Sequence, residues 1–124
     1  IYIGIALWEV ITTDLFDEWY EQQDEATQDK ILAALVALSQ GGPNLGRPLV
    51  DTVYESRFTN MKELRIQHRG RPLRAFFTFD PLRRAIVLCI GDKRGEKRFY
   101  KEMIQIAEEQ YECHLANLGE QNHG

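Results

Sequence analysis

The chain has 124 residues, of which 44% are hydrophobic and 10% aromatic, and its net charge at pH 7 is −4. This size and apolar content predict one domain around a single core, and no apolar run approaches the roughly 20 residues that cross a bilayer. Because the sequence also lacks the pattern of a signal peptide, we expect a soluble, cytoplasmic protein.

Charge is distributed unevenly along the chain. Residues 41–100 hold thirteen Lys and Arg against six Asp and Glu, whereas residues 1–40 hold one Lys against eight acids and residues 101–124 hold one Lys against five. Clustered cations attract phosphates, which makes RNA or another polyanion the first partner to consider. The alternative is a solvated charged surface that binds no partner.

The first forty residues predict a strand followed by a helical hairpin. Residues 2–8 alternate between apolar and other side chains, as a half-buried strand does. Thr12–Thr13 offers an N-cap for a helix that runs to about Gln23. A second helical pattern over residues 31–38 stops at the Gly-Gly-Pro sequence of residues 41–43.

The remainder predicts a loop, a small sheet and a last helix. Segment 41–60 lacks periodicity, and its length is unusual for a loop without a function, so we expect it to line a site. Three strands over residues 63–67, 73–79 and 85–90 are joined by tight turns, which predicts an antiparallel meander. The final helix is expected over residues 99–118.

Together these elements predict an α+β fold with an N-terminal strand, a helical hairpin, an antiparallel three-strand meander and a C-terminal helix, in which the helices cover one side of the sheet. We place a single domain at residues 1–118 and a flexible tail at residues 119–124. Neither Cys89 nor Cys113 has a CxxC partner, so both are expected to be reduced, structural thiols.

Strand alternation defines the candidate site. The apolar residues of the first two meander strands must face the helices, so Arg65 and Arg74 point together to the opposite, open side. A bound phosphate relieves the repulsion between two guanidinium groups and accepts bidentate hydrogen bonds from them. The alternative is that each arginine pairs with a nearby acid such as Glu63 or Asp80. Lys93 follows the third strand and is expected over the same face. The other basic residues that we expect around it are Arg57, Lys62, Arg71, Arg94 and Arg98.

These residue types suit RNA cleavage without a metal or another cofactor. Attack of the 2′-hydroxyl on its neighbouring phosphate requires deprotonation of that hydroxyl, neutralisation of the phosphorane and protonation of the leaving 5′-oxygen. Arg65 and Arg74 suit the second task, whereas Lys93 and Tyr100 are of types that transfer protons. His68 is a further candidate for RNA contact or proton transfer, and equally a structural histidine near a turn. The sequence has no Gly-rich phosphate cradle, which gives a small-molecule phosphate enzyme little support.

Several short motifs occur together in the basic region. They are GRP at 46–48, NMKELR at 60–65, the HRGRPLR hairpin that ends at Arg74, FDP at 79–81, and GDK followed by RFY. With this set of motifs, residues 45–100 resemble the phage Gp49-like branch of the RelE/HigB toxins, and the flanking helices extend the resemblance to nearly the whole chain.

The resemblance implies a RelE-like fold and a type II toxin, a ribosome-dependent mRNA endoribonuclease that inhibits translation. It also implies a cognate antitoxin that contains a DNA-binding helix-turn-helix. In relatives of this kind the working residues are basic groups on the central strands and an aromatic near the start of the last helix. Those positions correspond here to Arg65, Arg74, Lys93 and either Phe99 or Tyr100.

Two positions depart from the RelE pattern. This chain has Gln67 where the pattern has a second Lys, and an ungapped match places Phe99, not Tyr100, at the catalytic aromatic position. His68 or Lys62 then become candidates for the missing proton-transfer group. These departures leave an alternative open, in which a phage-derived module keeps the scaffold and binds RNA or protein without cleaving RNA.

Overall fold

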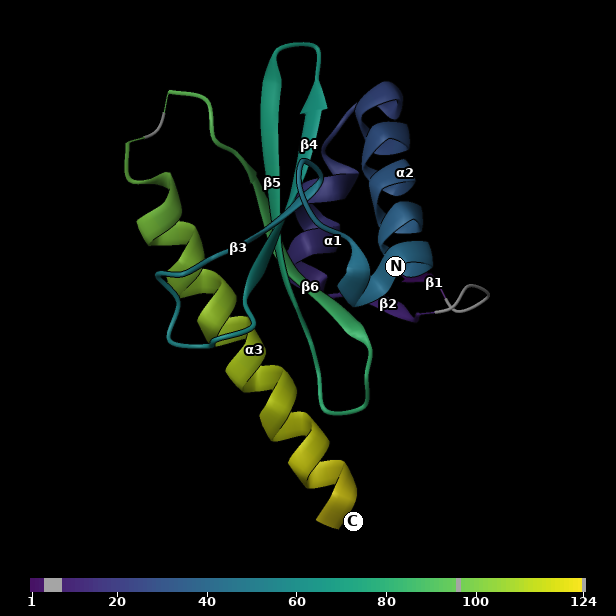
Figure 1. Ribbon diagram of the computed structural model, residues 1–124, viewed down its shortest axis with the longest axis vertical. Coiled ribbons are helices and arrows are strands. Elements are labelled where there is room, and N and C mark those ends of the chain that lie inside the picture. The colour runs from purple at the N-terminus through teal and green to yellow at the C-terminus, as the bar shows by residue number, and fades with distance from the viewer. Residues whose placement is uncertain (4–7, 96, 124) are drawn as a thin grey trace.

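The computed structural model describes residues 1–3, 8–95 and 97–123, and it has a twisted sheet with helices on both of its faces (Figure 1). The elements are β1 (Tyr2–Ile3), β2 (Val10–Thr12), α1 (Asp14–Glu21), α2 (Glu25–Gly41), a short 3-10 helix (Gly42–Asn44), β3 (Val50–Thr52), β4 (Lys62–His68), β5 (Arg71–Phe79), β6 (Ala85–Asp92) and α3 (Phe99–His123). In the described ranges the sheet has six strands in the order β1-β2-β6-β5-β4-β3. The predicted α+β class and the antiparallel meander β4-β5-β6 are confirmed.

The N-terminal strand differs from its prediction. The predicted strand over residues 2–8 includes residues 4–7, which lie outside the described residues. On either side of them, β1 pairs antiparallel with β2, and Ile3 lies opposite Val10. The strand β2 then runs parallel to β6, with Val10 opposite Ala85. A parallel pair needs a long crossover connection, and the segment that contains α1 and α2 begins it.

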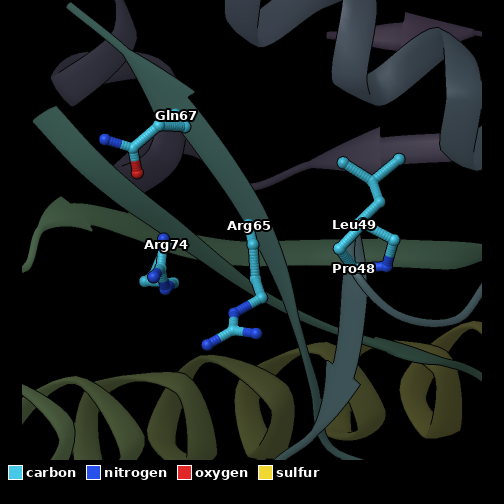
Figure 2. A pocket seen from close by; sticks show the side chains of 5 residues that line it. All are labelled: Pro48, Leu49, Arg65, Gln67 and Arg74. Atoms are coloured by element: carbon cyan, nitrogen blue, oxygen red, sulfur yellow. The ribbon is translucent and has the colours of Figure 1, made fainter. Parts of the chain in front are cut away.

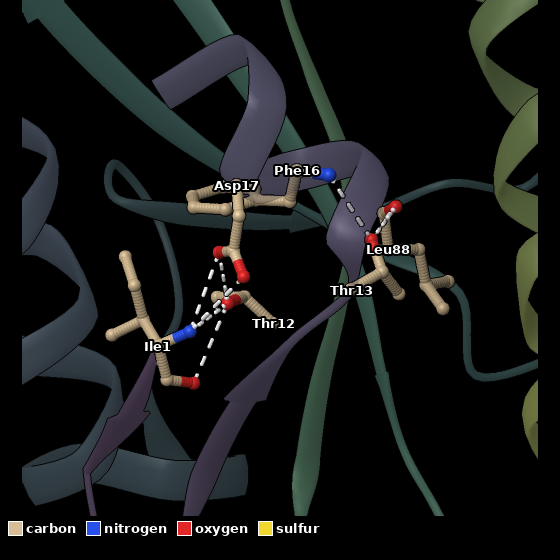
Figure 3. A network of polar contacts seen from close by, with 6 residues as sticks. All are labelled: Ile1, Thr12, Thr13, Phe16, Asp17 and Leu88. Atoms are coloured by element: carbon tan, nitrogen blue, oxygen red, sulfur yellow. Dashed lines mark hydrogen bonds and ion pairs between the residues drawn. The ribbon is translucent and has the colours of Figure 1, made fainter. Parts of the chain in front are cut away.

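Side-chain caps start both helices of the hairpin. The Thr13 hydroxyl accepts a hydrogen bond from the Phe16 amide at 3.2 Å and donates one to the Leu88 carbonyl of β6 at 2.7 Å (Figure 3). The Asp24 carboxylate accepts a hydrogen bond from the Thr27 amide at 2.9 Å. Each cap satisfies an amide that has no partner within its helix, and Thr13 also attaches α1 to the sheet.

The helices cover both faces of the sheet, so the expectation that they cover one side is wrong (Figure 1). On one face, α1 and α2 pack on a core that includes Phe16, Ile31, Leu35, Leu64, Ile66, Leu73 and Phe77. On the other, α3 packs on a core that includes Phe76, Ile86, Leu88, Cys89, Phe99, Ile104 and Ala107. The reason is β6, whose residues 85–91 are all buried, so that apolar cover is needed above and below it.

The second face is only partly covered by α3, which packs on β6 and β5. The loop between β3 and β4 packs against α3, where the Ser56 hydroxyl and the Arg57 amide both donate to Glu108 at 2.8 Å. The helix continues beyond residue 118, and the division into a domain and a tail stays a prediction. Among the described residues, none of the helices combines the length and apolar composition that a membrane crossing requires.

Candidate active site

Arg65 and Arg74 lie directly opposite each other on β4 and β5, on the face of the sheet that α3 partly covers. Their neighbours Leu64 and Ile66 point into the core beneath α1 and α2, as the alternation predicts. Arg65 is partly exposed, whereas Arg74 is only 7% exposed. Figure 2 shows the two side chains next to each other on neighbouring strands. The predicted pairing of the two arginines on one face is therefore confirmed, but the expectation that this face is open is wrong at Arg74, because α3 covers part of it.

The two arginines share one carboxylate. Glu63 Oε1 lies 3.3 Å from Arg65 Nε and 3.9 Å from Arg74 Nε, and Glu63 is only 5% exposed. Asp80, the other acid considered, pairs instead with Arg84 and His114. One negative group therefore faces two positive groups, which leaves the pair with excess positive charge. Sequence reasoning considered Glu63 only as an acid that could neutralise an arginine, and it did not identify Glu63 as part of the site. The signal was present, because Glu63 lies two residues before Arg65 on the same strand and therefore on the same face.

This arrangement leaves hydrogen-bonding capacity unused. Within the described ranges, Glu63 Oε2, Arg65 Nε and Arg74 Nε are buried and have no hydrogen-bond partner, because the short contacts to Glu63 Oε1 are ion pairs without hydrogen-bond geometry. Arg74 Nη1 is satisfied by the Leu73 carbonyl at 3.0 Å. Buried polar groups are normally paired, and unpaired donors on two arginines are suited to an incoming anion.

Tyr100 joins the arginines from the first turn of α3. Its hydroxyl donates to Glu63 Oε1 at 3.2 Å, and Lys93 Nζ lies 5.6 Å from the centre of its ring, within cation–π range. Burial raises the pKa of Tyr100, and the hydrogen bond to Glu63 raises it further, although Arg74 acts in the opposite direction. The phenol is therefore protonated at neutral pH. We call Glu63, Arg65, Arg74, Lys93 and Tyr100 the basic cluster.

Phe99 does not belong to the basic cluster. It is buried in the second core, with its ring 6.1 Å from that of Phe76. Gly91, which lies opposite Arg74 on β6, makes this close packing feasible, since an added Cβ there would lie 2.9 Å from the Phe99 ring. Phe99 thus fixes the start of α3 on the sheet, and the next residue, Tyr100, reaches Glu63.

Two hollows are each lined by two residues of the basic cluster. The first, which we call the cationic hollow, has a volume of about 340 Å³ and is lined by Pro48, Leu49, Arg65, Gln67 and Arg74 (Figure 2). The second, the acidic hollow, has a volume of about 250 Å³ and is lined by Arg47, Asp51, Thr52, Val53, Tyr54, Glu55, Glu63 and Tyr100. Residues of segment 41–60 line both hollows, in agreement with the prediction for this segment.

Three of the other basic candidates are not on the face of the basic cluster. Lys62 and His68 share the β4 parity of Leu64, which places them on the side of α1 and α2. Lys62 Nζ lies 3.5 Å from Thr52 Oγ1. Arg71 also faces that side, where it contacts Asp92 at 3.0 Å and Gln23 Oε1 at 3.2 Å and lies 6.0 Å from the Trp19 ring.

The remaining basic candidates lie in loops. Arg57 pairs with Glu108 at 3.6 Å and with Glu112, so it holds the β3–β4 loop against α3. Arg94 pairs with Asp92 at 3.4 Å and is exposed. Arg98 is exposed just before α3, two residues from Tyr100. Arg94 and Arg98 therefore belong to the segment that carries Lys93 and Tyr100, whereas Arg57 does not.

Asp80 and His114 form a separate contact between α3 and the β5–β6 turn. Asp80 Oδ2 lies 2.9 Å from His114 Nε2 and accepts hydrogen bonds from the Arg84 guanidinium, and Oδ1 accepts from the Leu82 and Arg84 amides. Burial tends to raise the pKa of Asp80, but the hydrogen bonds from His114 and Arg84 outweigh it and lower the pKa overall. This contact anchors the turn and is structural.

Neither cysteine is part of the basic cluster. Cys89 is buried in the second core, and burial raises the pKa of its thiol to about 12. Cys113 is exposed on α3, and both are free thiols. In the part of the chain that the structure describes, no group of three or more His, Cys, Asp or Glu residues is arranged to hold a metal ion.

Comparisons with known proteins agree with this geometry. The family described as phage derived protein Gp49-like matches residues 18–112. The putative toxin HigB2 of Mycobacterium tuberculosis is 46% identical over 102 residues, which cover 81% of this chain and 51% of HigB2, so the chain spans about half the length of that relative. The putative toxin HigB3 of the same organism is 41% identical over 109 residues, which cover 87% of this chain and 94% of HigB3.

A solved structure supports the fold. A mutant of the E. coli toxin RelE in the free state matches with a TM-score of 0.56 at 7% identity, over 77% of this chain and 92% of the RelE chain. At this identity the likeness concerns the fold alone, and it confirms the predicted RelE-like architecture. Given the family match over most of the chain and the match to HigB3 over nearly its full length, this chain belongs to the phage-derived Gp49-like branch of the RelE/HigB family.

Proposed function

We propose that this chain is the toxin of a type II toxin–antitoxin pair and that it cleaves mRNA on the ribosome without a metal ion. Two relatives at 41% and 46% identity are named as putative HigB toxins, and the fold is that of RelE. The observation that carries the proposal is the convergence of Arg65, Arg74 and Tyr100 on Glu63, with Lys93 against the Tyr100 ring, beside a hollow lined by both arginines.

The scissile phosphate binds at Arg65 and Arg74. Both arginines line the cationic hollow and have a buried Nε without a hydrogen-bond partner among the described residues. A phosphate there accepts hydrogen bonds from both and separates two like charges that a single carboxylate does not balance. The same groups stabilise the phosphorane, whose charge exceeds that of the ground state. Lys93, Arg94 and Arg98 extend the positive charge along the RNA backbone.

Glu63 and Tyr100 carry out the proton transfers. Glu63 Oε2 has no hydrogen-bond partner in the described chain and takes the proton of the 2′-hydroxyl, while the protonated Tyr100 phenol gives its proton to the leaving 5′-oxygen. The 2′-oxygen bonds to phosphorus as the bond from phosphorus to the 5′-oxygen breaks, which gives a 2′,3′-cyclic phosphate and a 5′-hydroxyl. After the products leave, Glu63 releases its proton to solvent and Tyr100 takes one from solvent, which restores the starting protonation of both groups.

Not every basic candidate keeps an RNA-binding role in this proposal. Lys62, His68 and Arg71 lie on the side of α1 and α2, and Arg57 is bound to α3 through Glu108. We therefore assign these four residues to the fold. The partners proposed are mRNA on the ribosome and a cognate antitoxin with a helix-turn-helix, as for other toxins of this kind.

Expression of Arg74→Ala in a bacterial host tests the proposal. Wild type is expected to arrest growth and to produce new mRNA 5′ ends within codons, as mapped by primer extension, and Arg74→Ala is expected to do neither. Arg83→Ala, which removes an exposed Arg at the β5–β6 turn that lines neither the cationic nor the acidic hollow, is the matched control and keeps both effects. Full toxicity of Arg74→Ala would reject the assignment of the site.

Gln67 favours a second candidate function. It lines the cationic hollow at the position where the RelE pattern has a Lys, so the hollow has one cation fewer than that pattern provides. In this alternative the chain binds RNA or a protein without cleaving RNA. Ribosome binding by wild type without new mRNA 5′ ends would favour it over the endoribonuclease.

A further inference from the structure

The acidic hollow, which Glu63 lines, differs in charge from the cationic hollow, which is lined by the two arginines that pair with Glu63. Three carboxylates, those of Asp51, Glu55 and Glu63, line it together with one guanidinium, that of Arg47. Arg47 is already bound to Asp51 at 3.0 Å. A phosphate is repelled by this surface, whereas an uncharged nucleobase is not, and its amino groups donate hydrogen bonds to carboxylates.

An exposed aromatic side chain stands at the edge of this hollow. Tyr54 lines it and is 85% exposed, which is unusual for an aromatic residue of this size. Tyr54 lies on a loop that is anchored to the rest of the fold. Its neighbour Val53 is buried, and the Val53 amide donates a hydrogen bond to the Met61 carbonyl at 2.9 Å. Further along, the Phe58 ring contacts that of Tyr111 on α3 at 5.0 Å. A solvent-facing ring on an anchored loop is a stacking platform for a base of single-stranded RNA.

The position of Glu63 defines which nucleotide reaches this platform. The 2′-hydroxyl that attacks belongs to the nucleotide on the 5′ side of the scissile phosphate, and its proton goes to Glu63, which lines the acidic hollow. The phosphate lies on the other side of Glu63, at the arginines of the cationic hollow. The ribose and base of the nucleotide that carries this 2′-hydroxyl therefore lie at the acidic hollow.

We infer that the acidic hollow is a binding site for the nucleoside 5′ to the cut, whose base stacks on Tyr54 and donates an exocyclic amino group to Glu55. This inference rests on the proposed function and adds a determinant of sequence preference. The Asp51 carboxylate already accepts hydrogen bonds from Arg47 and from the Thr52 amide, the latter at 2.9 Å. The exposed Glu55 carboxylate is therefore the one that we assign to the base. Adenine, cytosine and guanine carry such an amino group, and uracil does not.

A binding assay with an RNA that resists cleavage tests the stacking directly. The probe is a short single-stranded RNA with fluorine in place of every 2′-hydroxyl, followed by fluorescence anisotropy with the full chain. Tyr54→Ala is expected to bind about tenfold more weakly than wild type, and Tyr54→Phe, which keeps the ring, to retain most of the affinity. Tyr2→Ala, at an exposed tyrosine on the opposite edge of the sheet, is the control. Equal affinity of Tyr54→Ala and Tyr2→Ala would overturn the inference.

Mapping of cut sites tests the selectivity. Primer extension is expected to show uracil under-represented immediately 5′ to the cuts of wild type, and this bias is expected to be lost in Glu55→Ala, which has no side-chain acceptor. An unchanged bias in Glu55→Ala would remove Glu55 from the inference. If wild type makes no cuts at all, the proposed function fails, and the binding assay still decides whether Tyr54 stacks a base.

Discussion

Glu63→Gln changes the charge of the basic cluster and leaves its shape nearly unchanged. The substitution keeps the size of a side chain that is 7% exposed and removes the carboxylate that forms ion pairs with both Arg65 and Arg74. At an effective dielectric constant of about 20, contacts at 3.3 and 3.9 Å correspond to roughly 5 and 4 kcal/mol of attraction. The cost of burying these charges offsets much of this attraction. The 35% exposure of Arg65 also weakens its attraction to Glu63, because solvent screens the pair. We expect the free energy of unfolding to fall by about 3 kcal/mol.

Urea unfolding with and without inorganic phosphate measures this effect. Phosphate is expected to restore part of the lost stability of Glu63→Gln, because an anion between the two arginines replaces the missing carboxylate. The control is Glu18→Gln, an exposed residue on α1, for which a change within about 0.5 kcal/mol is expected. Stability of Glu63→Gln equal to that of wild type would refute the role of Glu63 as a shared counter-ion.

A double variant tests the charge balance between Glu63 and Arg65. Glu63→Gln combined with Arg65→Gln removes one charge of each sign, so stability is expected to recover in part relative to Glu63→Gln alone. Growth arrest is expected to stay absent, because the variant lacks both the proposed acceptor of the 2′-hydroxyl proton and one of the two phosphate-binding arginines. Stability no higher than that of Glu63→Gln alone would contradict the charge balance, and recovery of toxicity would contradict the proposed roles of both residues.

Three further substitutions probe single contacts. Arg74→Ala is expected to end growth arrest while the far-ultraviolet circular dichroism stays native, and an unfolded spectrum would contradict this. Tyr100→Phe removes the proton donor and is expected to reduce cleavage by about 100-fold or more with a loss of about 1 kcal/mol in stability, measured by primer extension and urea unfolding. Asp80→Asn is expected to destabilise the protein at pH 7. Because the folded state lowers the pKa of Asp80, its contribution is present above about pH 4 and is lost as the pH falls through the folded pKa, so melts of Asp80→Asn and wild type should converge in acid.

The pairing of the two arginines could be predicted because strands have a period of two and the hairpin turn is short. Once Leu64 and Ile66 are assigned to the core, Arg65 must face the other way, and the register of the hairpin places Arg74 opposite it. The same rule also assigns Lys62 and His68 to the core side, where the structure has them. Their inclusion among the site candidates rested on residue type and on nearness to Arg65 in the sequence, and did not apply this alternation.

Other features depend on packing that no local pattern encodes. The choice between Phe99 and Tyr100 is decided by the rotation of α3 about its axis, since neighbouring helical residues differ by about 100° in direction. That rotation is fixed by Phe99 against Phe76 and Gly91, which lie on two neighbouring strands of the sheet. The apolar run in β6 indicates that both faces of this strand are covered, but it does not identify α3 as the helix that covers the second face.

Because the two hollows differ in charge, the proposed site favours one 5′-to-3′ orientation of the bound RNA strand. Phosphate is attracted on the side of Arg65 and Arg74 and repelled on the side where Asp51 and Glu55 lie, so a strand bound in reverse would place its scissile phosphate away from both arginines. Glu63 lies at the boundary, with one oxygen toward the arginines and Tyr100 and the other without a hydrogen-bond partner among the described residues. A single buried carboxylate thereby keeps two like charges together and, in the proposed function, is the base next to the 2′-hydroxyl.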